Sequence, residues 1–217
     1  MPDQSAPGQH ADEPHRPGIA QRLNWLRAGV LGANDGIVST AAVAVGVAGA
    51  TSDVYPVLVA GAAALIGGAI SMALGEYVSV SSQRDSEKAL IAKERRELAD
   101  DPDGELEELV GLEQARGLSA ETARRVAVEL TERDALRAHL AIELNIDERD
   151  VVSPWHAAIA SAVAFTIGAL LPLATIVLIP HPARIVWTFA TVLVALAVTG
   201  WVAAWIGGSS RGRAVLR

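Results

Sequence analysis

Four long apolar stretches constrain this chain more than any other feature of its sequence. Residues 28–50 contain only Asn34 and Asp35 as strongly polar residues, residues 54–80 carry one charge, and residues 155–179 and 185–208 contain no Asp, Glu, Lys or Arg. About 20 consecutive apolar residues suffice for a helix to cross the hydrocarbon core of a bilayer. The chain is therefore predicted to be an all-α membrane protein whose four visible spans form a transmembrane helix bundle.

Short connections group these spans into two hairpins. Residues 51–53 leave room only for an antiparallel pair, and residues 180–184 form a turn that contains two helix-breaking prolines. The first transmembrane hairpin is predicted at residues 22–83. The second, together with a basic C-terminal end, is predicted at residues 151–217.

The charges of the chain gather in an insert between the hairpins. Residues 84–150 hold 19 Asp and Glu against 11 Lys and Arg, whereas the other 150 residues hold 6 and 7. Helix-favouring residues continue the second span through residue 99, and further helices are predicted at residues 105–116 and 119–145. Such an acidic three-helix domain favours cations as ligands and argues against nucleic acid as a partner.

Basic residues predict the orientation of the chain in the bilayer. They flank the N-terminal side, the start of the insert and the C-terminal end, whereas the loops on the opposite side share only Arg184. The positive-inside rule therefore predicts that both termini and the insert are cytoplasmic. Residues 1–21 lack the apolar run of a signal peptide and are predicted to be a disordered cytoplasmic tail.

Polar side chains within the first two spans are candidates for a transport pathway. A carboxylate such as Asp35 is costly inside a bilayer and normally faces a pathway or a partner, unless the span begins later and Asp35 lies at the interface. In the second span Met72 and Glu76 share one stripe. The thioether of Met72 is either a soft ligand for a transition metal or core packing. A neighbouring face of small residues, Gly67, Ser71 and Gly75, permits close helix contact.

Carboxylates of the insert are candidates for a metal site. Two E-x-x-E pairs each place two like charges on one helix face, where a bound cation would relieve their repulsion. On the last insert helix two glutamates and a histidine share a face at separations of seven and four residues. The predicted ligands are Glu94, Glu97, Glu105, Glu108, Glu132, His139 and Glu143. The alternative is a solvated charged face, which any soluble helix displays.

Three runs of the sequence resemble one known family. Residues 27–39, RAGVLGANDGIVS, are similar to the first-span signature of the vacuolar iron transporter family, and residues 71–80, SMALGEYVSV, resemble its second-span signature. Residues 153–173, which begin SPW and end LLPL, are similar to its third span. The resemblance extends from residue 22 to about residue 217.

This resemblance implies a dimeric, proton-coupled exporter of ferrous iron, and often of manganese, from the cytoplasm. The metal would be the substrate, and no prosthetic group is implied. The pathway would lie between the first two spans of both protomers, with Asp35 and Met72 on its transport residues. The metal-binding glutamates of the cytoplasmic domain, which gathers metal and feeds the pore, would be Glu94, Glu97, Glu105, Glu108 and Glu143.

The chain departs from the family pattern in two ways. His139 and Leu140 stand where some members have methionine, which changes a soft ligand. The family usually has five spans and this sequence shows four, so we expect either a truncated sequence or an unusual member. No organelle signal is visible, which favours a bacterial plasma membrane as the location.

Two other classes of function compete with transport. A membrane-anchored metal-binding or sensing protein would need the insert glutamates but neither Asp35 nor Met72. A ferritin-like ferroxidase is less compatible with the sequence, because the insert helices contain no E-x-x-H pair. The chain also lacks a phosphate-binding loop, an H-E-x-x-H motif and cysteine, so no enzymatic activity is predicted.

Overall fold

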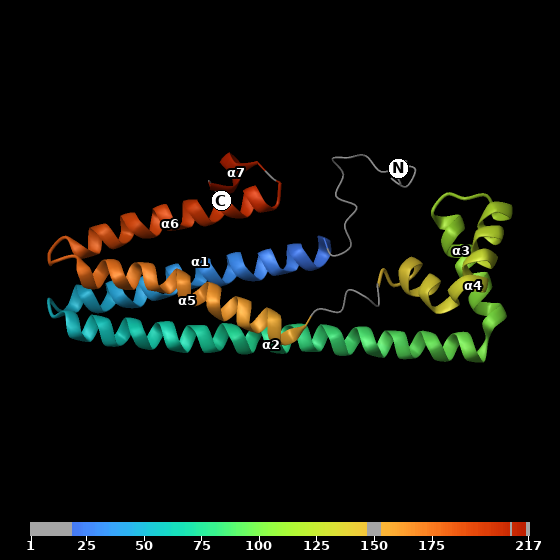
Figure 1. Ribbon diagram of the computed structural model, residues 1–217, viewed down its shortest axis with the longest axis horizontal. Coiled ribbons are helices and arrows are strands. Elements are labelled where there is room, and N and C mark those ends of the chain that lie inside the picture. The colour runs from blue at the N-terminus through green and yellow to red at the C-terminus, as the bar shows by residue number, and fades with distance from the viewer. Residues whose placement is uncertain (1–18, 147–152, 209, 216–217) are drawn as a thin grey trace, which may run out of the picture. The chain divides into compact units, whose positions relative to one another are not determined.

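The computed structural model describes residues 19–146, 153–208 and 210–215, with side chains from residue 26 onward, and shows helices joined by short connections (Figure 1). The helices are α1 (Ile19–Ala50), α2 (Val54–Asp100), α3 (Pro102–Ala115), α4 (Ala120–Ile142), α5 (Pro154–Leu178), α6 (Arg184–Ile206) and α7 (Arg211–Val215). No strand occurs in these ranges, and α1, α2, α5 and α6 are long and apolar enough to cross a membrane. The predicted all-α membrane fold with four spans is confirmed. Residues 1–18 of the predicted tail lie outside the described residues.

The chain divides into two compact units. Met1–Tyr77 and Pro154–Arg217 form one, here called the membrane unit, and Val78–Ser153 form the other, here called the insert. Helix α2 contributes residues to both units. Each unit is held together by its own contacts and is described by itself.

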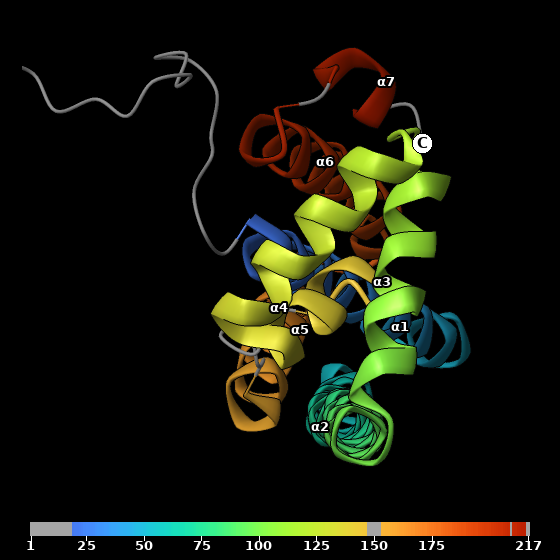
Figure 2. The same ribbon diagram turned by 90° about the vertical axis from the view of Figure 1, so that its right-hand side faces the viewer.

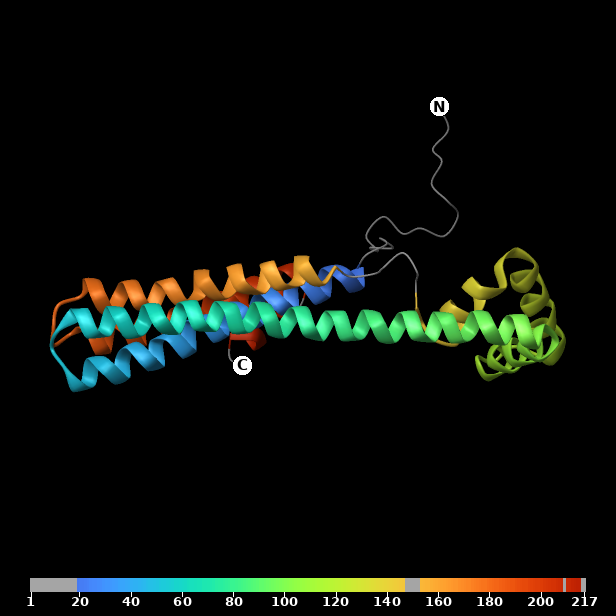
Figure 3. The same cartoon turned by 90° about the horizontal axis from the view of Figure 1, so that it is seen from below.

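Small residues bring the backbones of the membrane unit close together. A Cβ atom added to Gly36 of α1 would overlap the backbone carbonyl of Phe165 of α5, and one added to Gly168 would overlap the carbonyl of Ala33. The buried ring of Phe165 also fills the space beside Gly68 of α2. The side chain of Phe165 therefore lies where α1, α2 and α5 meet. Figure 3 shows the ribbons of these three helices in blue, cyan to green, and orange.

At the hairpin end of the membrane unit, Arg184 binds the end of α1. Its side chain is fully buried, and Nη2 donates to the carbonyl oxygen atoms of Thr51 at 2.5 Å and Ala48 at 3.5 Å, while Nη1 donates to Ser52 at 3.3 Å. The last carbonyl groups of a helix have no partner within that helix. Arg184 supplies a hydrogen-bond partner for these carbonyl groups and thereby ties the loop after α1 to the start of α6.

In the insert, α3 and α4 pack side by side around a small apolar core (Figure 2). That core consists of Leu109, Val110, Ala123, Ala127 and Ala138. The Asp101 carboxylate accepts a hydrogen bond from the Gly104 amide at 3.0 Å, and the Ser119 hydroxyl accepts one from the Thr122 amide at 3.3 Å. These caps begin α3 and α4. The break near residues 100–104 and the cap at Ser119 were both predictable from the sequence.

Helix α4 differs from the single straight helix that the sequence predicted. Asp134 has non-helical φ and ψ angles of −171° and 91°, and its carboxylate accepts a hydrogen bond from the Arg137 amide at 3.0 Å. Asp134 therefore ends one helical segment and caps the next. The predicted common face for Glu132, His139 and Glu143 is wrong for Glu132, because the interruption lies between it and the other two residues.

Candidate metal centre

Four side chains from three helices of the insert converge on one point. Glu94 comes from α2 and Glu105 from the first turn of α3, while His139 lies in the last turn of α4 and Glu143 directly follows it. The His139 Nδ1 atom lies 3.1 Å from Glu94 Oε1, 3.5 Å from Glu105 Oε2 and 3.6 Å from Glu143 Oε2. We call these four residues the His139 cluster.

The innermost members of the cluster are buried without hydrogen bonds. The side chain of His139 is 0% exposed and that of Glu94 is 3% exposed. Three of their atoms have no hydrogen-bond partner among the described residues: both ring nitrogen atoms of His139 and the Oε1 atom of Glu94. An unsatisfied buried polar group costs about 1–3 kcal/mol, and more when it is charged. A metal ion bound to both Nδ1 of His139 and Oε1 of Glu94 would remove that cost for these two atoms.

The spacing of the donor atoms suits a shared metal ion. Two ligand atoms that each lie about 2.1 Å from one transition metal ion, at angles of about 90–110°, are about 3.0–3.4 Å apart. The three Nδ1···O distances of 3.1, 3.5 and 3.6 Å lie at or just beyond that range. A proton on Nδ1 would form a good hydrogen bond to one carboxylate, whereas a metal ion could be coordinated by Nδ1 and by all three carboxylates. The cluster therefore provides a nitrogen and oxygen donor set for a divalent metal ion.

Electrostatics within the cluster also favours a cation. Burial, followed by the charge of Glu143, raises the pKa of Glu94 above its usual range. Burial also raises the pKa of Glu105, and neighbouring carboxylates raise it further, while His139 opposes the shift for both residues. The protein environment thus disfavours the ionised carboxylates, and a bound divalent ion would reverse that preference.

The remaining predicted ligands lie outside the cluster. Glu97 forms an ion pair with Lys93 at 2.7 Å, and this hydrogen bond raises the pKa of the lysine. Glu108 and Glu132 are exposed. The first glutamate of each E-x-x-E pair therefore enters the cluster, whereas the second lies beside it and acts on it through its charge.

One supporting pair of residues was not singled out from the sequence. Arg116 Nη1 lies 3.1 Å from the buried Glu113 carboxylate, and Arg116 Nη2 donates to the carbonyl oxygen of Ile142 at 3.2 Å. This bridge joins the end of α3 to the end of α4, next to Glu143. The i,i+3 spacing of an acid and a base was the signal available for it.

In the membrane unit, Asp35, Met72 and Glu76 occupy α1 and α2. Asp35 is exposed, and the Ser39 hydroxyl donates to its backbone carbonyl at 2.5 Å. Met72 and Glu76 are half-buried and lie about one turn apart on α2. Within the described residues, no hydrogen bond or ion pair joins the carboxylate of Asp35 to either of them.

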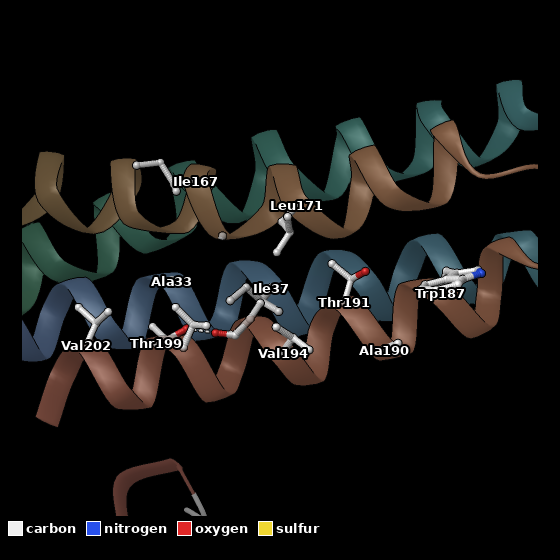
Figure 4. A pocket seen from close by; sticks show the side chains of 13 residues that line it. Ala33, Ile37, Ile167, Leu171, Trp187, Ala190, Thr191, Val194, Thr199 and Val202 are labelled. Atoms are coloured by element: carbon white, nitrogen blue, oxygen red, sulfur yellow. Dashed lines mark hydrogen bonds between the residues drawn. The ribbon is translucent and has the colours of Figure 1, made fainter. Parts of the chain in front are cut away.

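An apolar groove between α1, α5 and α6 was not predicted (Figure 4). Its volume is about 590 Å³, and its lining includes Ala33, Ile37, Leu171 and Trp187. Successive helical residues are about 100° apart, so Ala33 and Asp35 point to nearly opposite sides of α1. The groove is therefore separate from the candidate transport residues.

Comparison with known proteins shows similarity along almost the whole chain. The model of the VIT family matches residues 26–217. A protein from Acanthamoeba castellanii named vacuolar iron transporter is 45% identical over 187 residues, which cover 86% of this chain and 69% of that protein. Vacuolar iron transporter homolog 5 from Oryza sativa subsp. japonica is 36% identical over 200 residues, which cover 92% of this chain and 74% of that protein. VIT-like transporter 1a from Glycine max is 34% identical over 188 residues, which cover 86% and 73% of the two chains.

Proposed function

This chain belongs to the VIT family, and we propose that it carries ferrous iron out of the cytoplasm in exchange for protons, with the insert collecting the metal. Relatives named iron transporters support iron as the substrate. Manganese is the second candidate substrate. The proposed reaction moves ions and makes or breaks no covalent bond.

The observation that carries this proposal is the His139 cluster. His139 Nδ1 and Glu94 Oε1 are buried without a hydrogen-bond partner within the described residues, and Nδ1 lies at distances from the carboxylates of Glu94 and Glu105 that suit a shared divalent ion. In the proposal, Glu97 and Glu108 beside the cluster attract metal ions by their charge. The cluster would raise the local metal concentration on the side of the membrane from which export begins.

Asp35, Met72 and Glu76 are the proposed pathway residues. A carboxylate within a span requires compensation, which a passing metal ion or an exchanged proton would provide. We propose that protons exchange on Asp35 and Glu76, and that the sulfur of Met72 favours transition metals over harder ions.

A homodimer is part of the same proposal. Asp35 is exposed on the single chain, and an added Cβ at Gly67 or Gly75 would meet nothing within 4 Å in the described residues. These positions of α1 and α2 are therefore uncovered by the described residues, and in the proposal a second copy covers them. We further propose that the termini and the insert are cytoplasmic, from the distribution of basic residues, and that the membrane is a bacterial plasma membrane.

Transport by the full chain in liposomes tests the proposal. The Asp35→Asn variant keeps the size of the side chain but removes its charge, so we expect it to bind metal normally and to lose ferrous iron uptake at least tenfold. Asp53→Asn is the matched control, because Asp53 lies in the loop after α1. Asparagine keeps the side-chain oxygen that accepts a hydrogen bond from the Tyr55 amide. If Asp35→Asn transports like the parent chain, the proposed pathway is wrong. If the parent binds metal but transports none, the membrane-anchored metal-binding alternative is the better account.

A further inference from the structure

We infer that His139 is a direct metal ligand whose nitrogen sets the metal preference of the insert. The cluster would select divalent ions that bind imidazole well, namely Fe²⁺, Co²⁺, Ni²⁺ and Zn²⁺, over Mn²⁺ and Mg²⁺. This inference rests on the proposed function and deepens it, because it names the class of ion that the insert passes on.

The position of the imidazole carries the inference. The His139 side chain is 0% exposed, and both of its nitrogen atoms lack a hydrogen-bond partner among the described residues. Its Nδ1 atom lies within 3.6 Å of carboxylate oxygen atoms from three different residues. Buried polar groups are nearly always hydrogen-bonded, so an unpartnered imidazole aimed at three carboxylates calls for a ligand.

The donor set explains why one nitrogen matters. Without His139 the cluster would offer only carboxylate oxygen atoms, which suit Mg²⁺, Ca²⁺ and Mn²⁺. Affinity for a nitrogen donor rises from Mn²⁺ through Fe²⁺ and Co²⁺ to Ni²⁺, and Zn²⁺ also binds imidazole well. The single imidazole therefore discriminates among ions that the carboxylates would bind more evenly.

The local backbone holds this nitrogen in place. His139 and Glu143 lie four residues apart, and the Glu143 amide donates to the His139 carbonyl at 2.9 Å. Both ligands therefore belong to one helical turn, while Glu94 and Glu105 approach from two other helices. The competing explanation is a buried ion pair in which a protonated imidazole only balances the carboxylates. An ion pair would favour no metal over another.

Metal titration of the full chain in detergent micelles separates these explanations. His10 and His15 are first replaced by alanine, so that the remaining histidines are His139, His156 and His181. In His139→Gln and His139→Glu we expect the ratio of Zn²⁺ to Mn²⁺ affinity to fall at least tenfold, and His139→Glu should keep its affinity for Mn²⁺. His156→Gln and His181→Gln are matched controls on exposed residues of the membrane unit and should keep the parent ratio.

A second measurement requires no substitution within the insert. With isotope-labelled histidine, Zn²⁺ should shift the nitrogen resonance of one imidazole by the amount typical of direct coordination, even if a His139 variant fails to fold. An absence of any coordinated imidazole overturns the inference. An unchanged Zn²⁺ to Mn²⁺ ratio in a folded His139 variant, or an equal loss of both metals, also overturns it.

These results are independent of the transport assay. If the affinity ratio behaves as expected but liposomes take up no iron, the inference stands and the proposed function fails. If iron transport is normal but the ratio does not depend on His139, the proposed function stands and the inference fails.

Discussion

Burial determines the chemistry of Glu94. Its side chain is 3% exposed and lies beside His139, while burial and the charge of Glu143 raise its pKa. A proton and a metal ion therefore compete for the same oxygen atoms at a less acidic pH than they would at an exposed glutamate. The residue types of the cluster were predictable from the sequence, but this competition was not, because burial depends on how three helices pack.

The pH dependence of local stability tests this description of Glu94. Because the pKa of Glu94 is raised in the folded chain, protonation of Glu94 stabilises the metal-free insert. This contribution to folding stability is complete below about pH 4.5, the ordinary pKa of a glutamate, and is lost as the pH rises through the raised pKa. Without metal, protection of the α3 and α4 amides from hydrogen exchange should therefore increase as the pH falls through this window. We expect a smaller increase in Glu94→Gln than in the parent chain.

Comparison of variants at each pH removes the intrinsic pH dependence of exchange. Glu129→Gln replaces an exposed glutamate of α4 and should behave like the parent chain. Zn²⁺ should protect the parent more strongly than Glu94→Gln at neutral pH. Identical pH profiles for Glu94→Gln and the parent would show that Glu94 does not titrate in the buried environment described.

At the scale of helices, the interruption of α4 positions the metal ligands. Asp134 begins the short segment that carries His139 towards Glu94 and Glu105. The sequence predicted a break at residues 100–104 and a cap at Ser119, because helix-breaking and cap-forming residues interrupt the helical pattern there. The cap at Asp101 is a finding of the structure. The sequence did not predict the interruption of α4, because residues 120–142 contain neither glycine nor proline. Asp134 is a cap-type residue within a run of good helix formers, and its role is visible only once the helices are packed.

Removal of the internal cap should weaken metal binding from a distance. Asp134→Ala loses the hydrogen bond to the Arg137 amide, which costs about 1 kcal/mol, and allows α4 to straighten and to move His139. We expect Zn²⁺ affinity, measured by calorimetry on the full chain, to fall about tenfold. Asp134→Asn keeps the accepting oxygen and should bind Zn²⁺ like the parent. Equal affinities in all three chains would mean that the interruption does not position His139.

Arg184 should stabilise the membrane unit, because it ties the loop after α1 to the start of α6. Arg184→Met removes the guanidinium that binds the Thr51, Ser52 and Ala48 carbonyl groups, and hydrogen bonds to charged groups contribute about 1.5–3 kcal/mol each. We expect a loss of about 2–4 kcal/mol, seen as a lower thermal midpoint in detergent. Arg184→Lys should recover part of the loss, because a single ammonium cannot span several carbonyls as a guanidinium does.

The exposed Arg213 provides the control for that measurement. Arg213→Met removes the same charge from the same unit and should leave the midpoint within about one degree, because surface substitutions rarely change stability by more than about 0.5 kcal/mol. A midpoint for Arg184→Met equal to that of Arg213→Met would contradict the structural role assigned to Arg184.

At the scale of the whole molecule, the sequence predicted the spans but not how they pack. Apolar length is a local property, so the four spans could be read directly from composition. The small-residue face expected on α2 was Gly67, Ser71 and Gly75, yet Gly68 is the glycine of that region that meets Phe165. Several faces of α2 carry small residues, and the identity of the packed face depends on the neighbouring helix rather than on α2 alone.

Both units are needed in the proposed account. The insert would concentrate metal through the His139 cluster, and Asp35 and Met72 would conduct it across the bilayer in exchange for protons. Loss of the cluster should therefore weaken transport at low metal concentration and spare it at high concentration. Loss of Asp35 should abolish transport at every concentration.

Accumulation of ferrous iron driven by a pH gradient shows whether this chain exchanges iron for protons across a membrane. The full chain is reconstituted in liposomes with an acidic lumen and equal iron concentrations on both sides, under anaerobic conditions, with only outward-facing inserts counted. Each exchanged proton supplies about 1.4 kcal/mol per pH unit, enough for about tenfold accumulation. We predict that iron accumulates in the lumen of parent liposomes, that an ionophore which collapses the gradient abolishes this, and that Asp35→Asn liposomes accumulate none. Equal iron on both sides of parent liposomes despite a maintained pH gradient would contradict the account.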